Sequence, residues 1–254
     1  MTGNWVGTYH LFRREVTRFT KILIDTTVSP VISNILYLII FSVAFTGKKI
    51  LGVEYVDFLA SGLITMTLIN SSFSNPAFAL VIAKFSGTIS DLLIAPFTGA
   101  QIAISYIGAA VVRALVTALI TFIAILFFTH LTIHSIFFVI LSALLTSCFF
   151  GTLGVIFGYY ARQFDSLTMI TTFIITPMTF LGGVFYPISS LPEPWRTISL
   201  FNPMLYFIDF MRFSILGISY IEPQISISVA IISNIIMLPV AIFLFNQRKR
   251  LTLL

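Results

Sequence analysis

Long apolar runs separated by short polar connections dominate the chain. A helix of about 20 apolar residues crosses the ~30 Å hydrocarbon core of a bilayer. Six runs approach or exceed this length, and we predict spans at residues 28–45, 58–82, 102–129, 136–159, 166–183 and 225–245. The pattern therefore predicts an all-α integral membrane fold with six transmembrane helices.

Residues 1–25 carry a different pattern. Apolar residues recur there at spacings of 4, 3, 4, 3 and 4, which places them on one helical face: Trp5, Tyr9, Phe12, Val16, Phe19 and Leu23. The other faces hold Arg13, Arg14, Thr17, Arg18 and Lys21. We predict a helix lying in the inner membrane interface, where each cation gains about 1 kcal/mol from anionic lipid headgroups. A plain positive-inside anchor would explain the cations but not the ordered aromatic residues.

Composition agrees with a membrane protein. The chain is 58% hydrophobic and only 9% charged, whereas soluble domains average about 25% charged residues. No linker or low-complexity tract divides residues 1–254, so we expect a single transmembrane domain. The single cysteine, Cys148, lies within an apolar span, which excludes an intrachain disulfide.

The distribution of charge predicts the orientation. An even number of spans puts both termini on one side, and basic residues near both ends favour the cytoplasm: Arg13, Arg14, Arg18, Lys21, Arg248, Lys249 and Arg250. The segment between the fifth and sixth spans has a net charge of −1, which suits the outer side: Glu193, Arg196, Asp209, Arg212 and Glu222. The net charge of +5 thus reflects membrane topology, and nucleic acid is not an expected partner.

The end of the fifth span contains helix-breaking residues within an apolar run. Pro177 lacks a backbone N–H, and Gly182 and Gly183 weaken a helix. Free backbone groups are tolerated at membrane depth only where protein or a water-filled cavity surrounds them. We therefore predict a broken membrane helix around residues 177–187, ending at Tyr186 and Pro187.

The outer segment 185–222 is too apolar for an ordinary solvated loop. We predict two short helices in it, at residues 195–200 and 205–216, with Asn202 as N-cap and Pro203 near the first helical position. Asp209 and Arg212 are three apart on one helical face and can pair there. Both a structural role for this pair and direct substrate contact stay open.

The connection at residues 84–96 is predicted to be cytoplasmic and to contain a short helix. Thr88 or Ser90 can cap it, Asp91 suits its first turn and Pro96 ends it. Its apolar positions would then be exposed: Ile89, Leu92 and Leu93. An exposed apolar face with no membrane to enter favours a protein partner.

Polar residues inside the spans are candidates for a transport pathway, because burying them is costly unless they are paired or face water. The second span contributes Asn70, Ser71 and Ser74, the third Arg113, and the fifth Thr171 and Thr172. Helix–helix packing is the alternative role for the small hydroxylated residues. A counter-charge from Asp165 or Asp209 would make Arg113 structural.

The segment 177–187, together with Leu191-Pro192, the run 202–206, Asp209 and Arg212, resembles exporter-type permease subunits of ABC transporters. Residues 180–186 are most similar to inner-membrane permeases grouped with nodulation-factor and drug-type exporters. The resemblance implies a homodimer in a bacterial inner membrane, paired with two copies of a separate ATPase that binds ATP and Mg²⁺. The implied cargo is lipidic, glycan-linked or drug-like.

The same resemblance implies roles for three segments. Residues 84–96 would be the coupling helix that docks on the ATPase, although the family often has an acidic pair where this chain has Ser90-Asp91. The helix within residues 1–25 would also touch the ATPase. Residues 185–222 would form re-entrant helices that close the pathway on the outside.

The chain lacks the residues of several catalytic classes. Gly47-Lys48-Lys49 has neither the earlier glycine nor the hydroxyl of a phosphate-binding loop, so we expect no ATP hydrolysis and no cofactor in this chain. His130 and His134 lack the glutamate and the third ligand of a zinc hydrolase. A membrane-embedded assembly or scaffold protein and a secondary carrier remain the alternatives. An adjacent reading frame with Walker motifs would favour the transporter.

Overall fold

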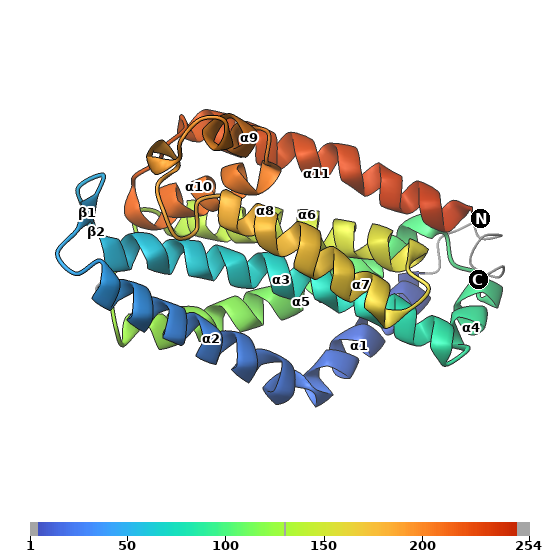
Figure 1. The fold of residues 1–254 in the computed structure, drawn as a ribbon. Coiled ribbons are helices and arrows are strands. Elements are labelled where there is room, and N and C mark those ends of the chain that lie inside the picture. Colours follow the sequence, from blue (N-terminus) through green and yellow to red (C-terminus); the bar gives the residue numbers. More distant parts are fainter. Residues whose placement is uncertain (1–4, 130, 248–254) are drawn as a thin grey trace.

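The computed structural model describes residues 5–129 and 131–247, of which most are helical. The elements are α1 (Trp5–Lys21), α2 (Leu23–Ala44), β1 (Lys49–Ile50), β2 (Val53–Glu54), α3 (Tyr55–Phe85), α4 (Thr88–Ile94), α5 (Gly99–Leu126), α6 (Ile136–Tyr160), α7 (Phe164–Ile170), a π-helical turn (Thr171–Ile175), α8 (Thr176–Leu181), a 3₁₀ turn (Ile188–Ser190), α9 (Trp195–Leu200), α10 (Pro203–Leu216) and α11 (Pro223–Asn246). The long helices run side by side, with β1, β2, α9 and α10 toward one end and α4 at the other (Figure 1).

Six helical segments are long and apolar enough to cross a membrane. They are Thr26–Ala44, Tyr55–Phe85, Gly99–Leu126, Ile136–Tyr160, Phe164–Leu181 and Pro223–Asn246. Each overlaps one predicted span, and the boundaries differ by at most three residues. The prediction of an all-α membrane protein with six spans is confirmed.

Helix α3 is the centre of the bundle. In its membrane-spanning window 78% of residues are buried, compared with 17% in the spans of α2 and of α7–α8. Glycines of α6 allow close approach to α3, since a Cβ on Gly158 would lie 2.9 Å from Ala77 Cα and one on Gly154 would collide with the Phe73 carbonyl. Small residues at helix contacts permit this close packing in lipid.

Lys84, near the inner end of α3, binds the end of α6. Its Nζ donates to the carbonyl oxygens of Gly158, Tyr159 and Ala161 at 3.0, 2.6 and 2.8 Å. The last carbonyls of a helix have no partner within the helix, so one ammonium group satisfies three acceptors at this terminus. The two central helices are thereby joined at the end where α4 lies.

The fifth span departs from the prediction at Pro177. The helix is not broken there but continues from Phe164 to Leu181, because a π-helical turn at Thr171–Ile175 comes just before the proline. A wider turn accommodates the missing N–H and the bulk of the proline ring. The break comes later, where Gly182 and Gly183 end α8, and Gly183 has a φ of +82°.

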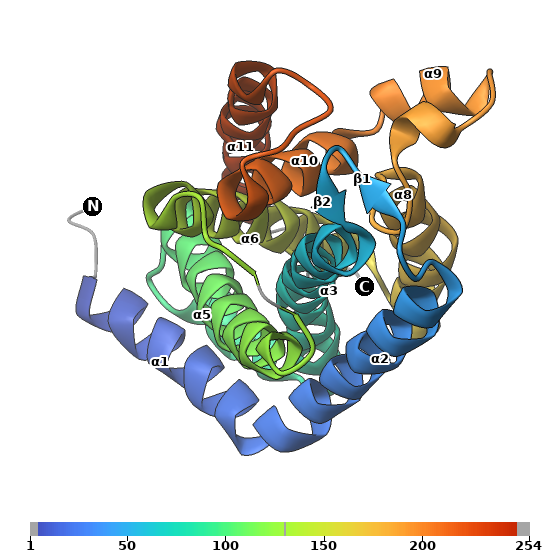
Figure 2. The same ribbon diagram turned by 90° about the vertical axis from the view of Figure 1, so that its left-hand side faces the viewer.

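Helix α1 is present as predicted, and of the predicted apolar stripe only Phe19 is buried against the molecule. Thr8, Leu11, Glu15 and Phe19 are buried, whereas Trp5 and Tyr9 are 68% and 59% exposed. The helix lies obliquely across the bundle, and together with α2 it forms a V around α5 and α3 (Figure 2). The basic residues Arg248, Lys249 and Arg250 lie outside the described residues.

The Lys84 contacts predict a stability effect. We expect Lys84→Met to lower the free energy of unfolding by about 2 kcal/mol, since a hydrogen bond from a charged donor contributes about 1.5–3 kcal/mol. Denaturant titration of the purified protein in detergent would measure it. The control is Lys21→Met at an exposed position on α1, and equal stability of the two variants would contradict the capping role of Lys84.

Candidate functional site

Four of the predicted pathway residues lie around one pocket at mid-depth in the bundle. Asn70, Ser71 and Ser74 of α3 and Arg113 of α5 line a pocket of about 420 Å³. The remaining lining comes from the α1–α2 elbow and from α3: Arg18, Ile22, Thr26, Ser29, Pro30, Asn75, Phe78 and Ile82. The tertiary fold thus joins polar groups that are far apart in sequence.

The two pathway candidates of the fifth span do not line this pocket. Thr171 Oγ1 donates to the Leu167 carbonyl oxygen at 2.9 Å, so its hydroxyl is satisfied within its own helix. Thr172 is exposed on the same helix as the 72% exposed Phe173. Both threonines belong to the span that is among the least buried in the molecule.

Asn75 connects the pocket to α1, and the sequence already marks it as one of the polar residues of the second span. Its Oδ1 accepts hydrogen bonds from Arg18 Nη2 at 3.1 Å and from Arg113 Nη1 at 3.3 Å. The available signal was its place in the same polar run as Asn70, Ser71 and Ser74. Only the fold shows that two guanidinium groups converge on it.

Arg113 has no acidic partner within 4 Å among the described residues. The suggested counter-charges, Asp165 and Asp209, form no ion pair with it, and its buried Nε has no hydrogen-bond partner. A neutral amide cannot balance a charge, and an uncompensated buried ion costs several kcal/mol. Within the part of the chain that the structure describes, no ion pair therefore compensates the charge of Arg113.

Arg14 and Arg18 of α1 both bind Glu15. Arg18 Nε lies 2.9 Å from Glu15 Oε2 and Arg14 Nη2 lies 3.0 Å from Glu15 Oε1. The Glu15 side chain is only 4% exposed, whereas that of Arg14 is 50% exposed. Contact of these arginines with lipid headgroups stays a prediction.

At the end of the bundle that carries the β1–β2 hairpin, the turn after α8 is fixed to α3 and α10. Arg212 Nη2 donates to the Gly183 carbonyl oxygen at 2.8 Å, and its guanidinium carbon lies 3.8 Å from the centroid of the Phe58 ring. Tyr55 donates its hydroxyl to the Phe185 carbonyl oxygen at 2.7 Å. These contacts satisfy backbone groups that the glycine break leaves free.

Asp209 and Arg212 do not form the ion pair that their spacing suggested. Asp209 accepts instead from Tyr220 N at 2.8 Å, from Ser226 Oγ at 3.2 Å and from Ile221 N at 3.4 Å. The two side chains diverge because each has carbonyl or amide partners in a different connection. Burial raises the pKa of Tyr220 to about 12, so this phenol stays neutral.

The two short helices of the outer segment are present. α9 matches the predicted range 195–200, and α10 begins at Pro203, two residues before its predicted start. Asn202 caps α10, since its Oδ1 accepts from Met204 N at 3.0 Å, and its Nδ2 donates to the Met178 carbonyl oxygen. The capping side chain therefore also binds α8.

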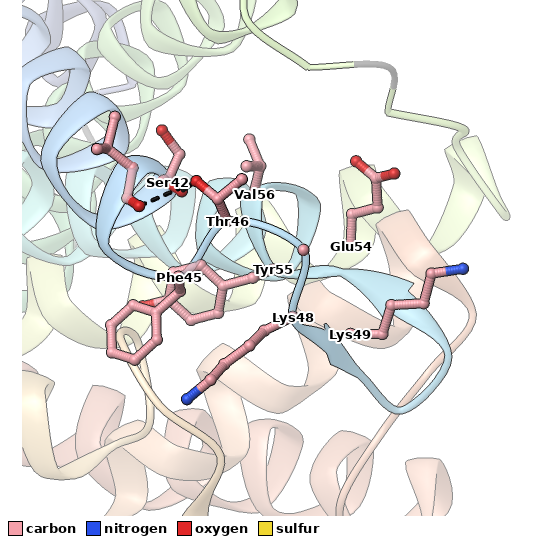
Figure 3. Close-up of a pocket in the computed structure, with 10 residues that line it drawn as sticks. Ser42, Phe45, Thr46, Lys48, Lys49, Glu54, Tyr55 and Val56 are labelled. Carbon is pink, nitrogen blue, oxygen red and sulfur yellow. Dashed lines mark hydrogen bonds between the residues drawn. The ribbon is translucent and has the colours of Figure 1, made fainter.

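Tyr186 and Pro187 line a pocket of about 520 Å³ beside the β1–β2 hairpin, together with Lys48 and Lys49. A neighbouring pocket of about 430 Å³ lies on the other side of the hairpin base. There Lys48 turns toward Phe45, with Nζ 4.9 Å from the ring centroid, while Lys49 and Glu54 point away (Figure 3). The outer end thus carries cations next to aromatic rings.

The short helix α4 differs from its prediction in what it exposes. Ile89 and Leu92 are only 6% and 4% exposed and belong to a core cluster with residues of α3 and α5, whereas Ile94 is 84% exposed. Neither Thr88 nor Ser90 caps it, because Gly87 precedes the helix with a φ of +73°. The side chain of Leu93 lies outside the described residues.

Within the described residues, no group of three or more His, Cys, Asp or Glu side chains is placed to hold a metal ion. His134 packs against Phe213, with ring centroids 5.4 Å apart, and His130 lies outside the described residues.

Comparison with known proteins gives consistent matches. A family model described as ABC-2 type transporter matches residues 7–216. The inner membrane transport permease YadH of Escherichia coli strain K12 is 37% identical over 218 residues, which cover 85% of both chains. Nodulation protein J of Rhizobium leguminosarum bv. viciae is 24% identical over 220 residues, or 84% of this chain and 83% of that protein. Nodulation protein J of Sinorhizobium fredii is 28% identical over 218 residues, which cover 82% of this chain and 80% of that protein.

The Asp209 contacts predict that this carboxylate holds the connection between α10 and α11. We expect Asp209→Ala to lower the free energy of unfolding by about 3 kcal/mol, because the variant loses hydrogen bonds to a charged acceptor. The exposed carboxylate Glu54, replaced by Ala, provides the control. Chemical denaturation in detergent would compare them, and a loss no larger than that of the control would exclude the structural role.

Proposed function

The chain belongs to the ABC-2 type transporter family, and on this premise we propose that it is the permease subunit of an ATP-driven exporter. Two copies form the translocation pathway, and a separate ATPase subunit on each copy binds ATP and Mg²⁺. The observation that carries the proposal is the mid-depth pocket, where Asn70, Ser71, Ser74 and Arg113, all of them in membrane-spanning segments, converge. Intramembrane polar groups of this kind mark substrate pathways.

A homodimer accounts for the uneven burial of the spans. The windows of α2 and α7–α8 are 17% buried, and the α7–α8 span carries exposed Thr172 next to Phe173. Hydroxylated side chains favour contact between membrane helices over contact with lipid. We propose that these faces of two copies meet and enclose the pathway.

The orientation proposed is both termini in the cytoplasm of a bacterial cell, with the protein in the inner membrane. Helix α4 lies toward the same end as the start of α1 and the end of α11 (Figure 1). This end carries Arg13, Arg14, Arg18 and Lys21, as the positive-inside rule requires. The name of the permease YadH includes the inner membrane, which supports the same location here.

Helix α4 is proposed to couple the permease to its ATPase. Asp91 and Ile94 are exposed on it, while Ile89 and Leu92 fix the helix to α3 and α5. A rigidly held helix can transmit a movement of the partner to the spans, whereas a loose loop cannot. The exposed residues are therefore the proposed contact, and the buried ones position it.

The outer turn is proposed as a gate. Gly182 and Gly183 end α8, and the segment 185–222 follows. Within this segment Asn202 and Arg212 bind backbone carbonyls of residues 178 and 183, and the gate residues there also include Pro203 and Asp209. Tyr55, Tyr186 and Pro187 line one pocket beside the hairpin, and Tyr55 also lines the neighbouring pocket. Movement of this turn relative to α3 would open the outer end to a lipidic, glycan-linked or drug-like cargo.

The coupling proposal is tested by changing only exposed residues of α4. We expect the double variant Asp91→Lys and Ile94→Asp to fold normally but to lose co-purification with the ATPase and transport-dependent ATP hydrolysis. The control is Leu51→Asp, an equivalent replacement in the hairpin turn at the opposite end. Full ATPase binding by the double variant would refute the coupling role, and failure of the native chain to bind any ATPase would favour a scaffold protein.

The gate proposal is tested with two glycines that share a backbone conformation. Gly183 and Gly52 have φ values of +82° and +86°, so alanine costs about 1–2 kcal/mol of strain at either position. We expect Gly183→Ala to slow export severalfold while assembly is retained, and Gly52→Ala to export normally. Vesicle export assays on correctly assembled protein would decide, and equal rates would remove the gate.

A further inference from the structure

Among the contacts of the described residues, no carboxylate balances the charge of Arg113 in the mid-depth pocket. Arg18 and Arg113 both donate to Asn75 Oδ1, at 3.1 and 3.3 Å, and Arg14 and Arg18 hold Glu15. In this chain of described contacts, three guanidinium groups share one carboxylate, which Arg113 does not contact. Arg113 is the member farthest from that carboxylate in the hydrogen-bond chain, and its buried Nε has no partner.

The depth of Arg113 makes this arrangement costly without a ligand. It is 14 residues from the start of α5 at Gly99, which at about 1.5 Å per residue places it near the middle of the helix. Intramembrane arginines are rare and are normally paired or directed to a water-filled space. Because Arg113 also lines a pocket, its unpartnered N–H points to an anion that none of the described residues supplies.

The pocket is continuous with a basic cleft at the inner end. A second pocket, of about 760 Å³, is lined by α1 and α3 and shares Arg18, Ile22 and Ile82 with the first. Its polar lining includes five basic residues and one acid: His10, Arg13, Arg14, Arg18, Lys21 and Glu15. An anion approaching from the inner leaflet would meet cations along the route to Arg113.

Apolar residues line the same route. Ile22 and Ile82 are 39% and 42% exposed, so they lie where the pocket meets the surface of the molecule, and Phe78 and Pro30 continue the wall. A small hydrated anion would gain nothing from these side chains. A headgroup attached to hydrocarbon would gain from both the cations and the apolar surface.

We propose that this pocket binds the anionic headgroup of an amphipathic molecule, with Arg113 and Arg18 as the cationic ligands and Phe78 and Ile82 against its hydrocarbon. The headgroup carries a phosphate or a similar anion, and its source is either a resident phospholipid of the inner leaflet or the transported molecule. Only the second source rests on the proposed export function. Binding itself requires neither ATP nor the ATPase.

The test uses the full chain in phosphatidylcholine nanodiscs. Dioctanoyl phosphatidylglycerol is the anionic probe, dioctanoyl phosphatidylcholine is the matched probe without net charge, and inorganic phosphate is the anion without a tail. Native mass spectrometry would measure binding. We expect the anionic lipid to bind at least tenfold more tightly than either comparator. An equal affinity for inorganic phosphate would refute the claim that the ligand is amphipathic.

Variants assign the site. Arg113→Gln should abolish the tenfold preference, and Arg113→Lys should retain part of it, whereas Arg196→Gln on exposed α9 should behave as wild type. An undiminished preference in Arg113→Gln would overturn the proposal.

Thermal unfolding gives an independent test. Without the probe, the unfolding temperature of Arg113→Gln should be no lower than that of wild type, because the variant lacks the unbalanced charge. The anionic probe should raise the unfolding temperature of wild type only. A variant destabilised without the probe would show that Arg113 is already compensated, which also overturns the proposal.

The complex with the ATPase separates the two sources. A transported molecule should stimulate ATP hydrolysis in wild type and not in Arg113→Gln, whereas a resident lipid should bind without changing hydrolysis. Either result, combined with the preference for the anionic probe, supports the proposal that the pocket binds an anionic headgroup. Absence of an ATPase partner, with binding intact, would contradict the export function and leave the binding site supported.

Discussion

Close packing of α3 against its neighbours is the contact on which the rest of the structure depends. Lipid tails are as apolar as leucine, so membrane helices associate through packing and hydrogen bonds rather than through the hydrophobic effect. Gly154 and Gly158 let α6 reach the α3 backbone, and Gly62 lets the turn at Val184 do so, since a Cβ there would lie 2.7 Å from the Val184 carbonyl oxygen. Because α3 is fixed on these sides, its polar residues can be held at a defined depth.

Two groups of buried charge show how differently the fold treats them. Arg212 and Asp209 bind backbone and hydroxyl groups of the outer connections, and Arg212 also lies over Phe58. Arg113 has one weak contact to an amide that it shares with Arg18. Both arginines keep buried N–H groups without a hydrogen-bond partner, but Arg212 fixes a turn and lies over an aromatic ring, whereas Arg113 borders a pocket. Sequence position alone does not distinguish these two uses of an intramembrane arginine.

Elements that depend on local composition could be predicted from the order of residues. Hydrophobic length fixed all six spans, because the thickness of the bilayer sets the same requirement on every helix. The cap at Asn202, the helix after Pro203 and the break at Gly182 and Gly183 follow from backbone preferences of those residue types. The run 70–75 and Arg113 were recognisable as unusual because polar groups are costly in an apolar span.

Tertiary structure alone decided which of these groups meet. Asp209 and Arg212 have the spacing of an ion pair, yet each binds groups from other segments instead. Ile89 and Leu92 of α4 are covered by α3 and α5 and are not available to a partner protein. Glu15, on the buried face of α1, binds Arg14 and Arg18, and Asn75 joins Arg18 to Arg113 although they lie 57 and 38 positions from it in the sequence. Each outcome depends on contacts between residues distant in sequence, for which helical periodicity carries no information.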